Sequence, residues 1–307
     1  MNQTTQMHQI AGWLGDYDQY FTPFFSDGLL GKASSMGFLE FTIMGHKRSR
    51  RSVEYLDSHN LRLDIGGMAH EYDLVVTCTD LIVPKHIKRR KIVLVQEGMT
   101  EPETILFHLA RNFQWVPRWI AGTSTTGLSD VYEKFCVASE GYRDLFIRKG
   151  VNPEKIKVTS IPNFDNCEQY LQNDFEYRDF VLVCTSDNRE TFVYENRQKN
   201  IMKYREMAGN SLLVFKLHPN ENAQRAIREI ERYAPDSMVF SEGRTEEMIA
   251  NSRMLIAQFS STIFVGSALN KVVHCGLDPK ELKALTPIQN KSASKKIADV
   301  CRQVIDG

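Results

Sequence analysis

Two stretches of sequence decide the fold of this chain: LLVFKLHP at residues 212–219 and MLIAQFSST at residues 254–262. Each begins as a short apolar run, which is typical of a buried strand, and each ends in polar residues. In an open sheet of parallel strands, ligands bind at the edge formed by the carboxyl ends of the strands. The polar ends of the two runs are therefore expected to meet at one ligand-binding edge.

The alternation of apolar runs with helical spacing extends along most of the 307 residues. It predicts an α/β fold with parallel strands and crossover helices, in two Rossmann-like domains. The polar segment 166–179 is interpreted as the linker, which gives an N-terminal domain at 1–170 and a C-terminal domain at 171–307. Residues 1–37 contain no clear strand. Strands are expected at 38–44, 72–78, 91–95, 155–161, 180–184, 211–217, 238–240, 254–259 and 271–274, and helices at 104–114, 140–149, 223–233, 245–252 and 292–305.

The composition excludes several classes of protein. Lys plus Arg and Asp plus Glu number 38 each, so no overall positive field favours nucleic acid. The six cysteines form no CxxC pair, which argues against a zinc site and for a reducing compartment. No apolar stretch is long enough to span a membrane, and residues 1–8 do not resemble a signal peptide. We therefore expect a cytoplasmic protein that uses neither a metal ion nor a cofactor.

Two local features stay open at this level. Basic runs occur at residues 47–51 and 85–91, although the chain as a whole is balanced. They are interpreted either as solvated surface or as a peripheral contact with the inner face of a membrane. Gly66-Gly67 is either a ligand loop of the N-terminal domain or a simple turn.

The motifs at these strand ends resemble those of a known group of enzymes. His218-Pro219 and Ser260-Ser261-Thr262 match, in order and in context, the His-Pro and Ser/Thr-Ser/Thr motifs of bacterial GT-B glycosyltransferases. Polysialyltransferases, capsule Kdo transferases and CDP-glycerol glycerophosphotransferases carry them. The sialyl and Kdo members also have an acidic pair before a glycine, where this chain has Gln96-Glu97-Gly98. The resemblance implies two Rossmann-like domains facing a cleft.

The resemblance also implies a reaction: transfer of a sugar, or a polyol phosphate, from a CMP-, CDP- or UDP-linked donor. The acceptor would be a hydroxyl of a glycan or lipid-linked glycan of the cell surface, with inversion and without a metal ion. Glu97, on a loop after a buried strand, suits the general base that takes the acceptor proton. His218 suits a hydrogen bond to the donor phosphate, and it is expected to act as a catalytic residue beside Glu97.

The phosphate-binding set predicted from the sequence is completed by Lys216, Pro219, Ser260, Ser261 and Thr262, because hydroxyls and helix-start amides favour an anion. Each member has a simpler explanation. His-Pro can end a strand, the hydroxyls can cap a helix, and a lysine on a strand can point away. Two other functions remain open: a non-hydrolysing UDP-sugar 2-epimerase, and a protein that binds nucleotide sugars without catalysis. The acids that follow the serine motif in such epimerases are missing between Ser260 and Ala268.

Overall fold

The computed structural model describes residues 2–23, 25, 46–113, 115–191, 193–258 and 260–307. The chain forms two compact units, which are described separately: unit 1 contains residues 1–165 and 287–307, and unit 2 contains residues 166–286. Each unit has one sheet of parallel strands, so the predicted α/β class with two Rossmann-like sheets is confirmed. The strand expected at 38–44 lies outside the described residues.

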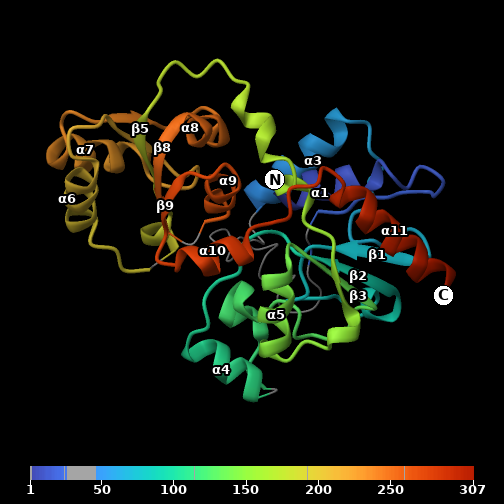
Figure 1. The fold of residues 1–307 in the computed structure, drawn as a ribbon. Helices are drawn as coiled ribbons and strands as arrows, with labels where there is room; N and C mark the ends of the chain where they lie inside the picture. Colours follow the sequence, from blue (N-terminus) through green and yellow to red (C-terminus); the bar gives the residue numbers. More distant parts are fainter. Residues whose placement is uncertain (1, 24, 26–45, 114, 192, 259) are drawn as a thin grey trace. The chain divides into compact units, whose positions relative to one another are not determined.

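Unit 1 has a four-stranded sheet in the order β1-β2-β3-β4 (Figure 1). All three strand pairs are parallel. β2 is almost fully buried over Ile92, Val93, Leu94 and Val95, as a parallel strand covered on both faces should be. The elements are α1 (Asn2–Ala11), α3 (His46–Ser58), β1 (Leu74–Thr77), β2 (Lys91–Val95), α4 (Ile105–Asn112), β3 (Lys134–Val137), α5 (Glu140–Lys149), β4 (Ile156–Val158) and α11 (Ala293–Asp306).

The last helix, α11, packs in unit 1 and not in the C-terminal unit where we expected it. Its buried side chains, such as Ile297 and Cys301, share a core with Ile10 of α1 and Val93 of β2. Figure 1 shows α11 lying along the strands of this sheet. Asp165 is the last residue of the first chain segment of unit 1, residues 1–165. Its buried carboxylate accepts a hydrogen bond from the Ala293 amide at 2.8 Å. This bond satisfies a free amide in the first turn of α11 and holds the returning chain in unit 1.

Unit 2 has a five-stranded parallel sheet in the order β7-β6-β5-β8-β9. From the central strand β5 the chain adds β6 and β7 on one side, and then crosses to add β8 and β9 on the other. The strand order therefore reverses between β5 and β8, and such a reversal is where open α/β sheets bind ligands. The elements are β5 (Phe180–Cys184), α6 (Arg197–Ala208), β6 (Leu213–Lys216), α7 (Ala223–Tyr233), β7 (Met238–Phe240), α8 (Thr245–Asn251), β8 (Ser252–Ala257), α9 (Thr262–Ala268), β9 (Val272–His274) and α10 (Pro279–Leu285).

The core of unit 2 explains why these segments fold as they do. α6 and α7 place Ile201, Tyr204, Ala226 and Ile230 against Val181, Val183 and Phe215 of the central strands. The apolar residues of α7 recur at helical spacing, and its other face carries arginines and glutamates.

Among the described residues, no helix is long and apolar enough to cross a membrane.

Candidate functional site

The first candidate region is the carboxyl edge of the unit 2 sheet, where β6 leads into His218-Pro219. The Glu221 amide donates to the His218 carbonyl at 3.0 Å, which closes a turn with Pro219 at its second position. Pro219 is exposed, so in this structure it shapes the turn. The backbone amide of His218 donates to the Thr185 hydroxyl at 2.9 Å. The turn is thereby tied to the residue that follows β5.

The His218 ring is partly exposed, and its Nδ1 atom has two polar neighbours. The Asn220 amide donates to Nδ1 at 3.3 Å, and the Asp187 carboxylate lies 3.6 Å away. Accepting at Nδ1 requires the tautomer that carries its hydrogen on Nε2, so Nε2 is the donor of the neutral ring. Protonation would instead place a second N–H beside Asp187. The neutral ring thus carries one N–H and the protonated ring carries two.

The serine and threonine cluster lies at the end of β8, the strand on the other side of β5. The Thr262 hydroxyl donates to the Ser260 hydroxyl at 3.0 Å, and the Ile263 and Phe264 amides donate to the Ser260 and Ser261 carbonyls. Cys184 ends β5, and burial raises the pKa of its thiol to about 12. A hydrogen bond with Thr262 acts in the opposite direction and lowers this pKa. The hydroxyl cluster therefore adjoins the central strand, and part of its hydrogen bonding stabilises the start of α9.

Lys216 has a partner inside the protein. Its side chain is buried, and its Nζ atom donates to the carbonyl of Ser241, just after β7, at 3.0 Å. Burial lowers the pKa of this lysine, because removing an ammonium group from water disfavours its charged form. The lysine thus connects the ends of β6 and β7, and its predicted role in phosphate binding stays a prediction.

Sequence reasoning missed the polar network behind His218. The Thr185 hydroxyl donates to the carboxylate of Glu221, and that carboxylate pairs with Arg197 of α6. The side chains of Glu221 and Arg197 are only 1% and 5% exposed, so this is a buried ion pair. The signal in the sequence was the polar run Thr185-Ser186-Asp187-Asn188 directly after the apolar run 180–184. It follows the same rule that identified the other two strand ends.

A separate candidate region lies in unit 1, where Glu97 follows β2. The Gln3 side chain of α1 donates to the Glu97 carboxylate at 2.7 Å, and the Gln6 side chain donates to the Glu97 carbonyl at 2.6 Å. The partly buried carboxylate is therefore oriented by a helix from residues 1–37, where the sequence showed no clear pattern. Burial and the negative charge of Glu97 raise the pKa of the Cys78 thiol well above its usual range.

Gln96, which replaces the first acid of the acidic pair, is a fully buried link. Its Nε2 atom donates to the Gly98 carbonyl at 2.8 Å, and its Oε1 atom accepts from the Ala138 amide at 2.9 Å. A carboxylate could make the second bond and not the first. Gln96 therefore holds the loop that carries Glu97 against the end of β3.

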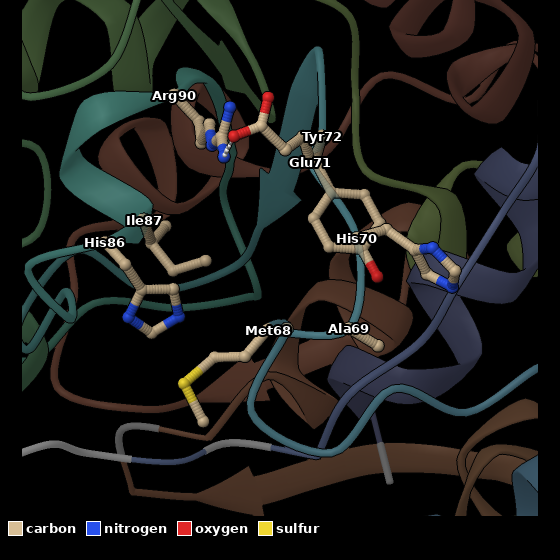
Figure 2. Close-up of a pocket in the computed structure, with 9 residues that line it drawn as sticks. Met68, Ala69, His70, Glu71, Tyr72, His86, Ile87 and Arg90 are labelled. Atoms are coloured by element: carbon tan, nitrogen blue, oxygen red, sulfur yellow. Dashed lines mark hydrogen bonds and ion pairs between the residues drawn. The ribbon is translucent and has the colours of Figure 1, made fainter.

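The Gly66-Gly67 segment borders a hollow of about 280 Å³ in unit 1, drawn in Figure 2. Both glycines have positive φ angles, and the Gly67 amide donates to the Asp64 carbonyl at 3.0 Å, which makes the segment a turn. The ring of His86 bonds the Gly66 carbonyl at 2.9 Å. Because Tyr72 precedes β1 and Arg90 precedes β2, this hollow lies at the amino edge of the sheet, opposite the edge of Glu97.

Part of the second basic run has partners in the described structure. Arg90 pairs with Glu71, and Lys91 donates to the carbonyls of Val304 and Ile305 in the last turn of α11. A cation is favoured there because the helix carboxyl end carries partial negative charge. These two residues therefore serve the fold of unit 1, and a membrane contact of the remaining residues stays a prediction.

Comparisons with known proteins show that the chain shares its fold with solved structures, but they do not assign it to a protein family. No protein-family model matches the chain, and no curated protein does. A solved structure of S. aureus MnaA with UDP is 11% identical, with a TM-score of 0.61 over 99% of this chain and 94% of that one. The UDP-GlcNAc 2-epimerase from Neisseria meningitidis bound to UDP-GlcNAc is 11% identical, with a TM-score of 0.51 over 97% and 89%. The wall teichoic acid polymerase TagF is 12% identical, with a TM-score of 0.46 over 98% of both chains.

Proposed function

We propose that this chain is a nucleotide-sugar-dependent transferase of the GT-B type, whose unit 2 binds the donor phosphate. The observation that carries the proposal is the arrangement at the strand-order reversal of unit 2. His218 follows β6, Ser260 and Thr262 follow β8, and both strands are hydrogen-bonded to β5. A ring N–H and hydroxyl donors at one edge are the groups that bind a phosphate. Two solved structures with this fold hold UDP and UDP-GlcNAc, and we extend that ligand class to this chain.

The proposed reaction moves a sugar, or a polyol phosphate, from the donor to a hydroxyl of a cell-surface glycan. The acceptor oxygen forms the new bond as its proton passes to the Glu97 carboxylate, and the bond to the leaving phosphate oxygen breaks. His218 and the hydroxyls stabilise the negative charge that develops on that oxygen. The hydrogen bond from Gln3 orients the Glu97 carboxylate, which is the proton acceptor in this scheme. No step requires a metal ion.

Calorimetric titration of the full chain with UDP, CDP and CMP tests the phosphate site. His218→Ala is expected to weaken the nucleotide that binds by about 10- to 150-fold, the equivalent of about 1.5–3 kcal/mol for a hydrogen bond to a charged group. His108→Ala is the matched control, because His108 is an exposed histidine on α4 of unit 1. Equal affinities of the wild type and His218→Ala would place the nucleotide elsewhere.

A second experiment tests the reaction. Incubation with radiolabelled CMP- and UDP-sugars distinguishes transfer to an acceptor, interconversion of the sugar by an epimerase, and binding without turnover. Glu97→Gln is expected to lower transfer by about 10²–10⁴-fold, the usual contribution of a general base, with nucleotide affinity unchanged. The control is Glu133→Gln, an exposed acid just before β3. Turnover by Glu97→Gln at the wild-type rate would exclude Glu97 as the base.

A further inference from the structure

Unit 2 contains a groove of about 1010 Å³ that includes none of the proposed donor-site residues. Its walls come from α6, from the end of β8, from β9 and from α10 with the segment before it. Known pockets for small ligands have about 300–1,000 Å³. The groove is therefore large enough for a ligand of several rings.

The charges around the groove have one prevailing sign. Its lining contains Lys203 on α6, Lys271 just before β9, and Lys283 on α10, against the single acid Asp278. Over the whole chain, basic and acidic residues are equal in number. The Lys271 ammonium donates to the Ala250 carbonyl at 2.7 Å, whereas Lys203 and Lys283 are exposed. Two solvent-exposed cations from different helices therefore border one groove, which favours an anionic occupant.

The remaining polar groups are those that recognise hydroxyl-rich molecules. Amide side chains line the groove at Asn200, Gln258 and Asn270, and the Gln258 amide donates to the hydroxyl of the buried Tyr204 at 3.4 Å. Amides can donate to and accept from sugar hydroxyls at once. Apolar residues such as Met207 and Leu282 fill the space between them.

From these features we propose that the groove binds an acidic oligosaccharide, with its carboxylates or phosphates beside Lys203 and Lys283. Gln258 lies two residues before Ser260, so one end of the groove is close in sequence to the proposed donor site. The binding itself goes beyond the proposed function, because it requires no nucleotide. In a transferase, such a groove would hold a charged glycan chain on the same unit that binds the donor.

The test uses the full chain and calorimetry with three probes of equal length: tetragalacturonate, neutral maltotetraose and tetraglutamate. Lys203→Glu/Lys283→Glu is expected to weaken tetragalacturonate by about tenfold or more, because two attractive contacts become repulsive. Lys199→Glu/Lys280→Glu is the matched control. It changes an exposed lysine outside the lining on each of the same two helices, with the same change in net charge. We expect this control to retain the wild-type affinity.

Three results would overturn the proposal. Equal loss of affinity in both double variants would mean that only net charge matters. Binding of maltotetraose as tightly as tetragalacturonate would remove the role of the lysines, and equally tight tetraglutamate would indicate a peptide site. Nucleotide affinity measured on the same variants keeps the two proposals apart. It should not change in either double variant, and its absence in the wild type would refute the donor site alone.

Discussion

The buried ion pair between Glu221 and Arg197 offers the sharpest test of how unit 2 holds the His218 turn. Glu221→Gln removes one charge and leaves Arg197 with Glu195, whose carboxylate is 3.2 Å away, and with Glu229 at 3.9 Å. Breaking a buried pair costs about 3–5 kcal/mol, and the remaining partners favour the lower part, about 3–4 kcal/mol. With a urea dependence of about 2 kcal/mol per molar, the unfolding midpoint should fall by about 1.5–2 M.

The chain itself provides an assay that distinguishes the two units. All three tryptophans, Trp13, Trp115 and Trp119, belong to unit 1. Tryptophan fluorescence therefore follows unit 1 in urea, while far-ultraviolet circular dichroism follows the helices of both units. We expect Glu221→Gln to shift an early part of the dichroism curve and to leave the fluorescence midpoint in place.

Two further variants make the result interpretable. Arg197→Met should destabilise unit 2 more than Glu221→Gln does, because it leaves the buried Glu195 without an arginine and Glu221 with only the more distant Arg189, at 4.0 Å. The new amide oxygen of Glu221→Gln still accepts from Thr185, so nucleotide affinity without urea should stay within about twofold of the wild type. A midpoint shift below about 0.5 M, or a milder effect of Arg197→Met, would refute the buried pair as a main support of unit 2.

Two other predictions concern particular side chains. The two hydrogen bonds from Arg189, at 2.8 and 2.7 Å, hold the pKa of Glu229 below its ordinary value of 4.5. A carboxylate whose pKa is lowered in the folded state stabilises that state at pH values above the unfolded pKa. The free energy of unfolding of the wild type should therefore exceed that of Arg189→Met by its full amount at pH 7. The difference, measured by urea titration, should shrink as the pH falls below about 4.5. Gln96→Glu should lower stability by about 1–3 kcal/mol, because a buried carboxylate cannot donate to the Gly98 carbonyl; an unchanged melting temperature would contradict that role.

The strands of unit 2 were predictable because buried parallel strands consist of continuous apolar residues. The run 180–184 coincides with β5 (Phe180–Cys184), and the run ending at His274 coincides with β9 to within one residue. The ends of these strands also indicated where His218 and Ser260 lie. In this part of the fold, local sequence and tertiary structure agree, since the topology brings the carboxyl ends of parallel strands to one edge.

The packing of α11 could not be predicted in the same way. The sequence predicted a helix at 292–305, and the structure has it at Ala293–Asp306. An amphipathic helix, however, has an apolar face that fits either sheet, so periodicity does not say which unit it covers. The choice depends on tertiary contacts, such as the bond between the Asp165 carboxylate and the Ala293 amide, which joins residues 128 positions apart.

The network behind His218 was missed for a related reason. Thr185, Glu221 and Arg197 come from a loop after β5, the turn after β6 and the start of α6. Nothing in the spacing of a threonine and a glutamate 36 positions apart predicts a hydrogen bond between them. Burial reveals the connection, because charges with 1% and 5% exposed side chains must be paired.

The contrast between Gln96 and Glu97 bears on the proposed transfer reaction. The side chain of Gln96 bonds the Gly98 carbonyl and the Ala138 amide, and Glu97 is the one acidic residue among residues 96–98. An inverting transfer needs one group to accept the acceptor proton, whereas epimerisation both removes and returns a proton at carbon and is served by more than one acid–base group. In the proposed transfer, the carboxylate of Glu97, oriented by Gln3, supplies this single proton acceptor. If Gln96→Glu were to fold and gain sugar interconversion in the radiolabel assay, that inference would fail.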